Sequence, residues 1–210
     1  SEMKPHILMD SDKQFSAKEV FEFDSIKDFR ERILEKEVES VLRKSHEDQF
    51  VWFEKQTKIP LRKGLENWPK FIEIFERRNL IAHTGGRVTS TYIAKCRAAG
   101  YEDLPKVGQV LQVTPDYLYE STEILMEVGI KLAQVLARVS SRSDEDIETA
   151  NSFLHELTYE LLYHEHYKIA ERLLSYAFSR EVKHTDQRTE YVMIVNRAIA
   201  LKNTGDIEKA

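Results

Sequence analysis

Three residues near the middle of the chain, Arg78, Asn79 and His83, have the types and the spacing for chemistry on a phosphate group. A histidine titrates at about pH 6.5, so it can give or take a proton at neutral pH. Arginine stays charged and can bind two phosphate oxygens at once. With 14 Arg, 7 His and 5 Asn in 210 residues, chance produces this Arg-Asn-x-x-x-His spacing about one time in a hundred. The pattern therefore indicates acid–base chemistry at residues 78–83.

The element that must position these residues is a predicted amphipathic helix from about Trp68 to Thr84. Gly85 and Gly86 follow it and are expected to end it with a left-handed cap. The apolar residues of one helix face recur at helical spacing, at Phe71, Ile74 and Ile81.

Helix geometry separates two of the candidate side chains. Arg78 and His83, five residues apart at about 100° each, lie roughly 140° apart around a regular helix. Asn79 and His83, four residues apart, share a face. The long Arg78 side chain therefore either wraps around the helix to reach His83 or acts across a dimer.

Residues 75–86, FERRNLIAHTGG, resemble the Arg-Asn-x-x-x-His signature of HEPN domains. This all-helical family includes many RNA-cleaving toxins and antiphage effectors. The resemblance covers roughly residues 20–140. Outside the motif it rests on the helical pattern alone. One HEPN toxin group has Tyr two residues after the His, where this chain has Gly85. The chain instead resembles the branch with a Gly-containing turn followed by Val88 and Tyr92; Tyr92 then either contacts substrate or belongs to the core.

The resemblance implies a metal-independent endoribonuclease that needs no cofactor and holds no metal. His83 would act on the ribose 2′-hydroxyl as general base or on the leaving oxygen as general acid, and Arg78 would stabilise the charge on the phosphorane, with Asn79 beside them. The products would be 2′,3′-cyclic phosphate and 5′-hydroxyl ends. The family pairs two domains so that both motifs line one cleft, so a homodimer is expected.

Charge along the chain fits a local phosphate site. The formal net charge is −5 overall, which excludes a polybasic coat for nucleic acid or membrane, while residues 76–106 carry +3. Arg77, Arg87, Lys95 and Arg97 are therefore predicted to bind RNA. The alternative for Arg77, Arg78 and His83 is that they are solvated residues or a structural cap, since His is favourable near a helix C-terminus.

The whole chain is predicted to be all-α, because it has seven Gly and five Pro with long stretches free of both. Residues 1–140 are expected to form a HEPN-like antiparallel helical bundle, with helices from about Ser25 to Glu47, around residues 50–58 and at 92–99. A loop at 105–113 precedes a helix that starts at Thr114-Pro115.

That helix carries a heptad seam that packs in its own bundle or in an intermolecular coiled coil. The seam consists of Leu118, Leu125, Leu132 and Val139, with Val128 and Val135 beside it.

Residues 141–210 resemble tetratricopeptide helix-turn-helix repeats. At an offset of 40 residues the segment aligns with itself, pairing Leu161 with Leu201 and Glu165 with Gly205. A further repeat begins at Gly205-x-Ile207-x-x-Ala210, so we expect the sequence to be part of a longer array. Such repeats imply a protein partner.

Two other features limit the possible functions. His155, His164 and His166, with Glu156 and Glu165, could hold zinc, but the His-x-His pair lies about 200° apart on a helix, so no metal is expected. A single cysteine, Cys96, and no long apolar run predict a cytoplasmic chain without membrane contact. The alternative to a ribonuclease is a non-catalytic HEPN-like dimerisation domain whose repeats scaffold protein partners.

Overall fold

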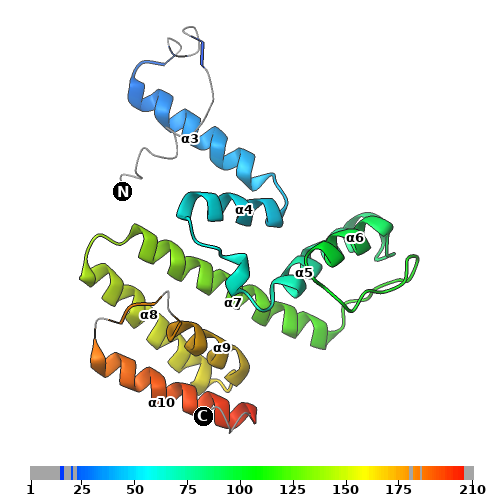
Figure 1. The fold of residues 1–210 in the computed structure, drawn as a ribbon. Helices are drawn as coiled ribbons and strands as arrows, with labels where there is room; N and C mark the ends of the chain where they lie inside the picture. The colour runs from blue at the N-terminus through cyan, green and yellow to red at the C-terminus, as the bar shows by residue number, and fades with distance from the viewer. Residues whose placement is uncertain (1–14, 17–19, 21–22, 180–181, 185, 206–210) are drawn as a thin grey trace. The chain divides into compact units, whose positions relative to one another are not determined.

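The computed structural model describes residues 15–16, 20, 23–179, 182–184 and 186–205 (Figure 1). The prediction of an all-α chain is confirmed: within these residues there are helices and no strand. None of the described helices is both long and apolar enough to span a membrane. The chain divides into two compact units, residues 1–64 and 65–210.

The first unit contains α3 (Ile26–Leu42), α4 (His46–Thr57) and a short 3-10 turn at Arg62–Gly64. Helix α3 begins where the sequence predicts, and the Ser25 hydroxyl caps it by accepting from the Asp28 N–H. The helix expected to reach Glu47 ends at Leu42, because Ser45 caps a new helix. The Gln49 amide stabilises this break by donating to the carbonyls of Val41, Leu42 and Lys44.

The second unit begins with α5 (Trp68–Thr84), whose bounds match the prediction. Gly85 ends it in the left-handed conformation, with φ of 59°, and the Gly86 N–H donates to the Leu80 carbonyl at 3.0 Å. Gly86 also has a positive φ, and a β-carbon there would lie 2.5 Å from the Leu111 carbonyl oxygen. Both positions favour glycine because their φ angles are positive. Gly86 also has no room for a side chain beside the Leu111 carbonyl.

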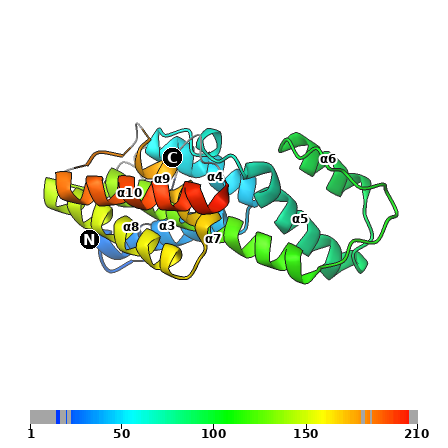
Figure 2. The same cartoon turned by 90° about the horizontal axis from the view of Figure 1, so that it is seen from below.

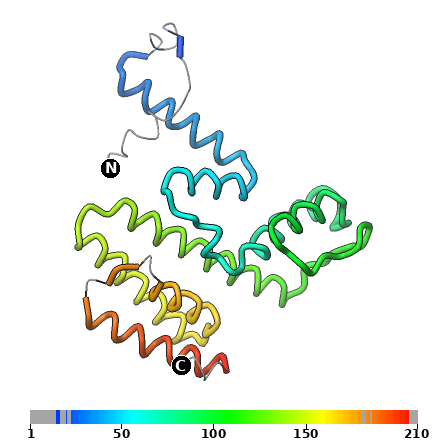
Figure 3. The backbone as a smooth tube through the Cα atoms, viewed as in Figure 1, coloured from blue at the N-terminus to red at the C-terminus, as the bar shows by residue number. Residues whose placement is uncertain are grey.

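The chain then forms α6 (Ser90–Ala98) and a long loop before α7 (Pro115–Ser140) (Figure 3). Backbone hydrogen bonds join the segment after α5 to the end of this loop: Val88 N–H to Gln109, Gly108 N–H to Val88, and Leu111 N–H to Gly86. Thr114 caps α7 and Pro115 occupies its first turn, as predicted.

The buried face of α7 differs from the predicted heptad seam. Val128 and Val135 are buried, but Leu118, Leu125 and Val139 are exposed. The helix instead buries a face that includes polar residues with partners of their own, so the apolar spacing alone did not identify it. The buried residues of this face are Ser121, Ile124, Glu127, Val128, Gln134 and Val135.

Helix α7 joins the two halves of the second unit. Helices α5 and α6 lie toward one end of it, and α8 (Asp144–Tyr163), α9 (Tyr167–Ala177) and α10 (Gln187–Thr204) toward the other (Figure 2). Both α8 and α9 pack against α7. The structure places the division between its two compact units after Gly64. The sequence indicated a boundary at about Ser140, where α7 ends, but α7 packs both on α5, which precedes it, and on α8 and α9, which follow it.

Helices α8, α9 and α10 pack on one another around a common apolar core. Leu154, Leu173, Leu174 and Met193 are fully buried in it. Leu161 and Leu201, paired by the 40-residue offset, are both buried. Glu165 and Gly205, paired by the same offset, both follow a helix with positive φ, 62° and 89°. The offset thus matches the ends of α8 and α10 but not their buried faces, because the fully buried Leu154 pairs with Ile194, which is 47% exposed. Ile207 and Ala210 lie outside the described residues.

The conformation of Glu165 leads to a stability prediction. A non-glycine residue in the left-handed region is strained, so Glu165→Gly should raise the free energy of unfolding by up to about 1 kcal/mol. The matched control is Glu160→Gly, at an exposed position inside α8, which should lower it by about 1 kcal/mol. Urea unfolding of both variants measures the difference, and an equal loss in both would contradict the assignment.

Candidate functional site

Arg78, Asn79 and His83 occupy the last two turns of α5, directly before the Gly85 cap. The side chains of Arg78 and His83 are exposed, and that of Asn79 is partly buried. Within the described part of the chain, none of the three makes a side-chain hydrogen bond or an ion pair. They are therefore free to contact a ligand.

The neighbouring Arg77 is bound inside the fold. Its Nε donates to the Glu73 carboxylate at 2.6 Å, one turn earlier on α5. Its guanidinium lies 3.9 Å from the centre of the Tyr117 ring and donates to the Gln112 carbonyl. The side chain is 15% exposed. Arg77 is predicted to bind RNA, but in the structure protein groups hold its guanidinium. These contacts stabilise the fold.

Glu73 is the centre of this arrangement and is 2% exposed. Besides Arg77, it accepts hydrogen bonds from the Tyr92 hydroxyl of α6 at 2.6 Å and the Tyr117 hydroxyl of α7 at 2.9 Å. Burial, together with the Glu73 charge, raises the pKa of Tyr92 and of Tyr117, so both stay protonated as donors. Of the two alternatives for Tyr92, the structure shows a core residue, 1% exposed. The Glu73 cluster is defined as Glu73, Arg77, Tyr92 and Tyr117.

The other predicted RNA-binding residues have different environments. Lys95 forms an ion pair with Glu76 of α5 at 2.9 Å, and Arg87 donates to the Gly108 carbonyl at 3.0 Å. Arg97 is exposed on α6 and has no ion-pair partner among the described residues. Arg78, Arg87 and Arg97 are therefore the cations of this set whose charge no protein carboxylate within the described ranges neutralises.

The histidines of α8 and of the turn after it do not converge. His164 faces Glu160 at 3.8 Å, while His166 bonds through Nδ1 to the Tyr119 hydroxyl at 2.9 Å. Among the described residues, there is no group of three or more His, Cys, Asp or Glu side chains that could hold a metal ion.

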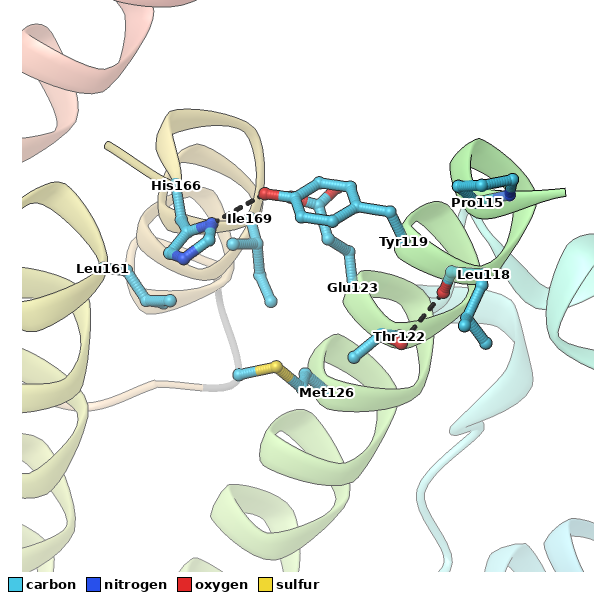
Figure 4. A pocket seen from close by; sticks show the side chains of 9 residues that line it. All are labelled: Pro115, Leu118, Tyr119, Thr122, Glu123, Met126, Leu161, His166 and Ile169. Carbon is cyan, nitrogen blue, oxygen red and sulfur yellow. Dashed lines mark hydrogen bonds between the residues drawn. The ribbon is translucent and has the colours of Figure 1, made fainter. Parts of the chain in front are cut away.

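The sequence interpretation missed two features. Glu73 stands between apolar neighbours on the buried stripe of α5, four residues before Arg77, and this spacing could have indicated an internal ion pair. The second is a cavity of about 350 Å³ between residues 115–126 of α7 and the residues Leu161, His166 and Ile169 (Figure 4). We call it the α7–α9 pocket. No sequence signal marks it, because its lining residues come from α7, α8, α9 and the turn between α8 and α9.

Comparison of the chain with models of protein families, with curated proteins and with solved structures finds no match. The resemblances to HEPN domains and to tetratricopeptide repeats rest on the residues of this chain and stay predictions.

The Glu73 cluster predicts a large difference between two glutamates of α5. Glu73→Ala leaves the Arg77 guanidinium without its carboxylate inside the fold and should lower the free energy of unfolding by about 3–5 kcal/mol. Glu76→Ala, the matched control, leaves Lys95, which is 47% exposed and rehydrates; it should cost less than about 1 kcal/mol. Similar losses in chemical denaturation would argue against the cluster as a central contact.

Cys96 gives a second prediction. It is fully buried, and burial, with the nearby Glu73 charge, raises the pKa of the thiol from 9.0 to about 12. The reactive thiolate is therefore absent at pH 9, where an exposed cysteine is about half ionised. A disulfide reagent at pH 9 should label the folded protein slowly and the guanidinium-unfolded protein at once. Rapid labelling of the folded protein would show that Cys96 is accessible.

Proposed function

We propose that this protein is a metal-independent endoribonuclease of the HEPN type. The observation that supports it most is the contrast between adjacent arginines: Arg77 is bound to Glu73, whereas Arg78 and His83 are exposed and unpaired among the described residues. An exposed arginine and histidine without protein partners are available to bind and act on a phosphodiester.

The proposed reaction uses the side chains already on α5. His83 takes the proton from a ribose 2′-hydroxyl, whose oxygen attacks the adjacent phosphorus. The bond from phosphorus to the 5′-oxygen breaks, and that oxygen receives a proton from the protonated imidazole of His83. Arg78 stabilises the charge that builds on the phosphorane oxygens, and Asn79, on the His83 face, orients the substrate. The products are a 2′,3′-cyclic phosphate and a 5′-hydroxyl.

The separation of Arg78 and His83 around α5, roughly 140°, supports a site built from two copies of the chain. In a homodimer whose α5 ends face each other, Arg78 of one copy reaches the phosphate that His83 of the other attacks. Arg97 and Arg87 are then the remaining cations for the RNA backbone on either side. We propose a cytoplasmic toxin or antiphage effector, with the helical repeats α8–α10 binding a partner protein.

A second candidate is a non-catalytic dimerisation domain whose repeats scaffold other proteins. The observation that favours it is the apolar surface of α10, where Tyr191, Val195 and Ile199 are exposed along one stripe. A helix with apolar residues on both faces is ordinarily covered on both. This candidate predicts no RNA cleavage by the purified protein or by any variant.

His83→Ala tests the ribonuclease directly. It should lower the rate of RNA cleavage in EDTA by about 10²–10⁴-fold, because it removes the acid–base group. It should leave stability within about 0.5 kcal/mol, because the side chain is exposed. His164→Ala, at a 63% exposed histidine outside the motif, is the matched control and should cleave like the wild type.

The product ends separate the possible outcomes of this experiment. Mass spectrometry should find cyclic phosphates with the wild type and with His164→Ala. Cleavage that His83→Ala leaves intact, or 3′-hydroxyl ends, would contradict the proposal. Absence of cleavage by the wild type on structured and unstructured RNA would favour the scaffold.

A further inference from the structure

The end of α4 and the turn after it carry a run of basic residues within the first compact unit (Figure 1). Residues 54–64 have a net charge of +3, although the whole chain has −5. The charged residues of this segment are Glu54, Lys55, Lys58, Arg62 and Lys63. The three lysines are exposed, and none of them forms an ion pair within the described part of the chain. The first unit therefore has a concentration of positive charge of its own.

Hydrogen bonds between Arg62 and Glu54 fold this segment back on α4. The Arg62 backbone N–H donates to Glu54 Oε1 at 2.9 Å, and its Nη2 and Nε donate to Oε2 at 2.7 and 3.0 Å. These bonds lower the pKa of Glu54, so the carboxylate stays ionised and bound to Arg62. Arg62 also faces Glu47 at 3.8 Å. Because Lys55 follows Glu54 and Lys63 follows Arg62, the contact brings two lysine-bearing parts of the chain together, while Arg62 meets the acids beside them.

Lys58 ends α4 in a strained backbone conformation. Its φ is 61°, in the left-handed region, which is unfavourable for a residue with a β-carbon. Glycine takes the same place after α5 and after α10. The Lys58 side chain is exposed, and no carboxylate of the described residues pairs with it. Strained residues cluster at binding sites, so the strain and the free ammonium group together favour a role for Lys58 in binding an anion.

An aromatic ring lies on the same side of α4 as the first of these lysines. Trp52 precedes Lys55 by three residues, so the two share a helix face. The Trp52 ring packs on Phe53 in a T-shaped arrangement and is partly exposed, whereas the other tryptophan of the chain, Trp68, is 8% exposed. Lysines that bind phosphates beside a ring that stacks on bases are typical of sites for single-stranded nucleic acid. An acidic peptide would use the lysines alone.

We propose that Trp52, Lys55, Lys58 and Lys63 form a second RNA-binding site, in which a base of single-stranded RNA stacks on Trp52 and the neighbouring phosphates contact the lysines. The proposal rests on the proposed function in one respect, that RNA is the substrate. It does not depend on cleavage, because none of these four residues belongs to the motif of α5. The site adds affinity for the substrate and takes no part in the reaction.

The probe is a fluorophore-labelled single-stranded RNA with 2′-O-methyl groups, which cannot be cleaved through the 2′-hydroxyl, titrated with the full chain by fluorescence anisotropy. Replacing both Lys55 and Lys63 by alanine should weaken binding by about tenfold or more at low salt and make the affinity less dependent on salt. The matched control replaces Lys27 and Lys36, two exposed lysines of α3, by alanine. It removes the same charge and should change the affinity less than about threefold.

Tryptophan fluorescence tests the stacking. RNA should quench the emission of the wild type, and Trp52→Leu, which keeps the buried Trp68, should lose this quenching and bind more weakly. Quenching that survives in Trp52→Leu would contradict the assignment of the base to this ring.

Two further results would overturn the proposal. In the first, the two double variants weaken binding equally, with thermal unfolding showing that both are folded; net charge then explains the binding. In the second, a polyglutamate peptide displaces the RNA as effectively as unlabelled RNA does, and the lysines take any polyanion. Binding through Lys55 and Lys63 without cleavage of unmodified RNA would support this site and contradict the ribonuclease. Cleavage with binding that neither double variant changes would contradict this site alone.

Discussion

The buried carboxylate of Glu73 is the constraint on which the second unit depends. A carboxylate that is 2% exposed has to be met by donors, and here they come from three helices: Arg77 of α5, Tyr92 of α6 and Tyr117 of α7. Since the partners must surround one group, they fix the rotation of α5 about its axis. That rotation turns Arg77 inward and leaves the end of the helix, with Arg78 and His83, facing solvent.

A second buried carboxylate, Glu127, ties the other end of the unit together. It is 1% exposed, accepts from the Asn67 side chain at 2.8 Å and from Lys131, and forms an ion pair with Arg172 of α9 at 2.6 Å. Breaking such a pair leaves a charge in the protein interior, which is costly. Helix α7 is therefore bound through charges to the start of α5 and to α9. This explains why the unit extends past Ser140 into α8, α9 and α10.

Elements with local signals could be predicted from the sequence, and contacts between helices could not. The bounds of α5 and the start of α7 follow from Pro115, Thr114 and the glycines after Thr84, each of which acts on its own backbone. The buried face of α7 depends on Glu127 and Gln134 finding partners on other helices, so the leucines at heptad spacing did not identify it. For the same reason Arg77 and Arg78 could not be told apart before Glu73 and Tyr117 were placed beside one of them.

The most direct test of this account compares Arg77→Ala with Arg78→Ala in equilibrium unfolding and in RNA cleavage measured side by side. The account predicts opposite profiles: Arg77→Ala loses several kcal/mol of stability, on the order of a broken buried pair, while Arg78→Ala keeps wild-type stability and loses cleavage. If Arg78→Ala cleaves RNA at the wild-type rate, or if the two variants lose stability equally, the division of roles between the adjacent arginines is wrong.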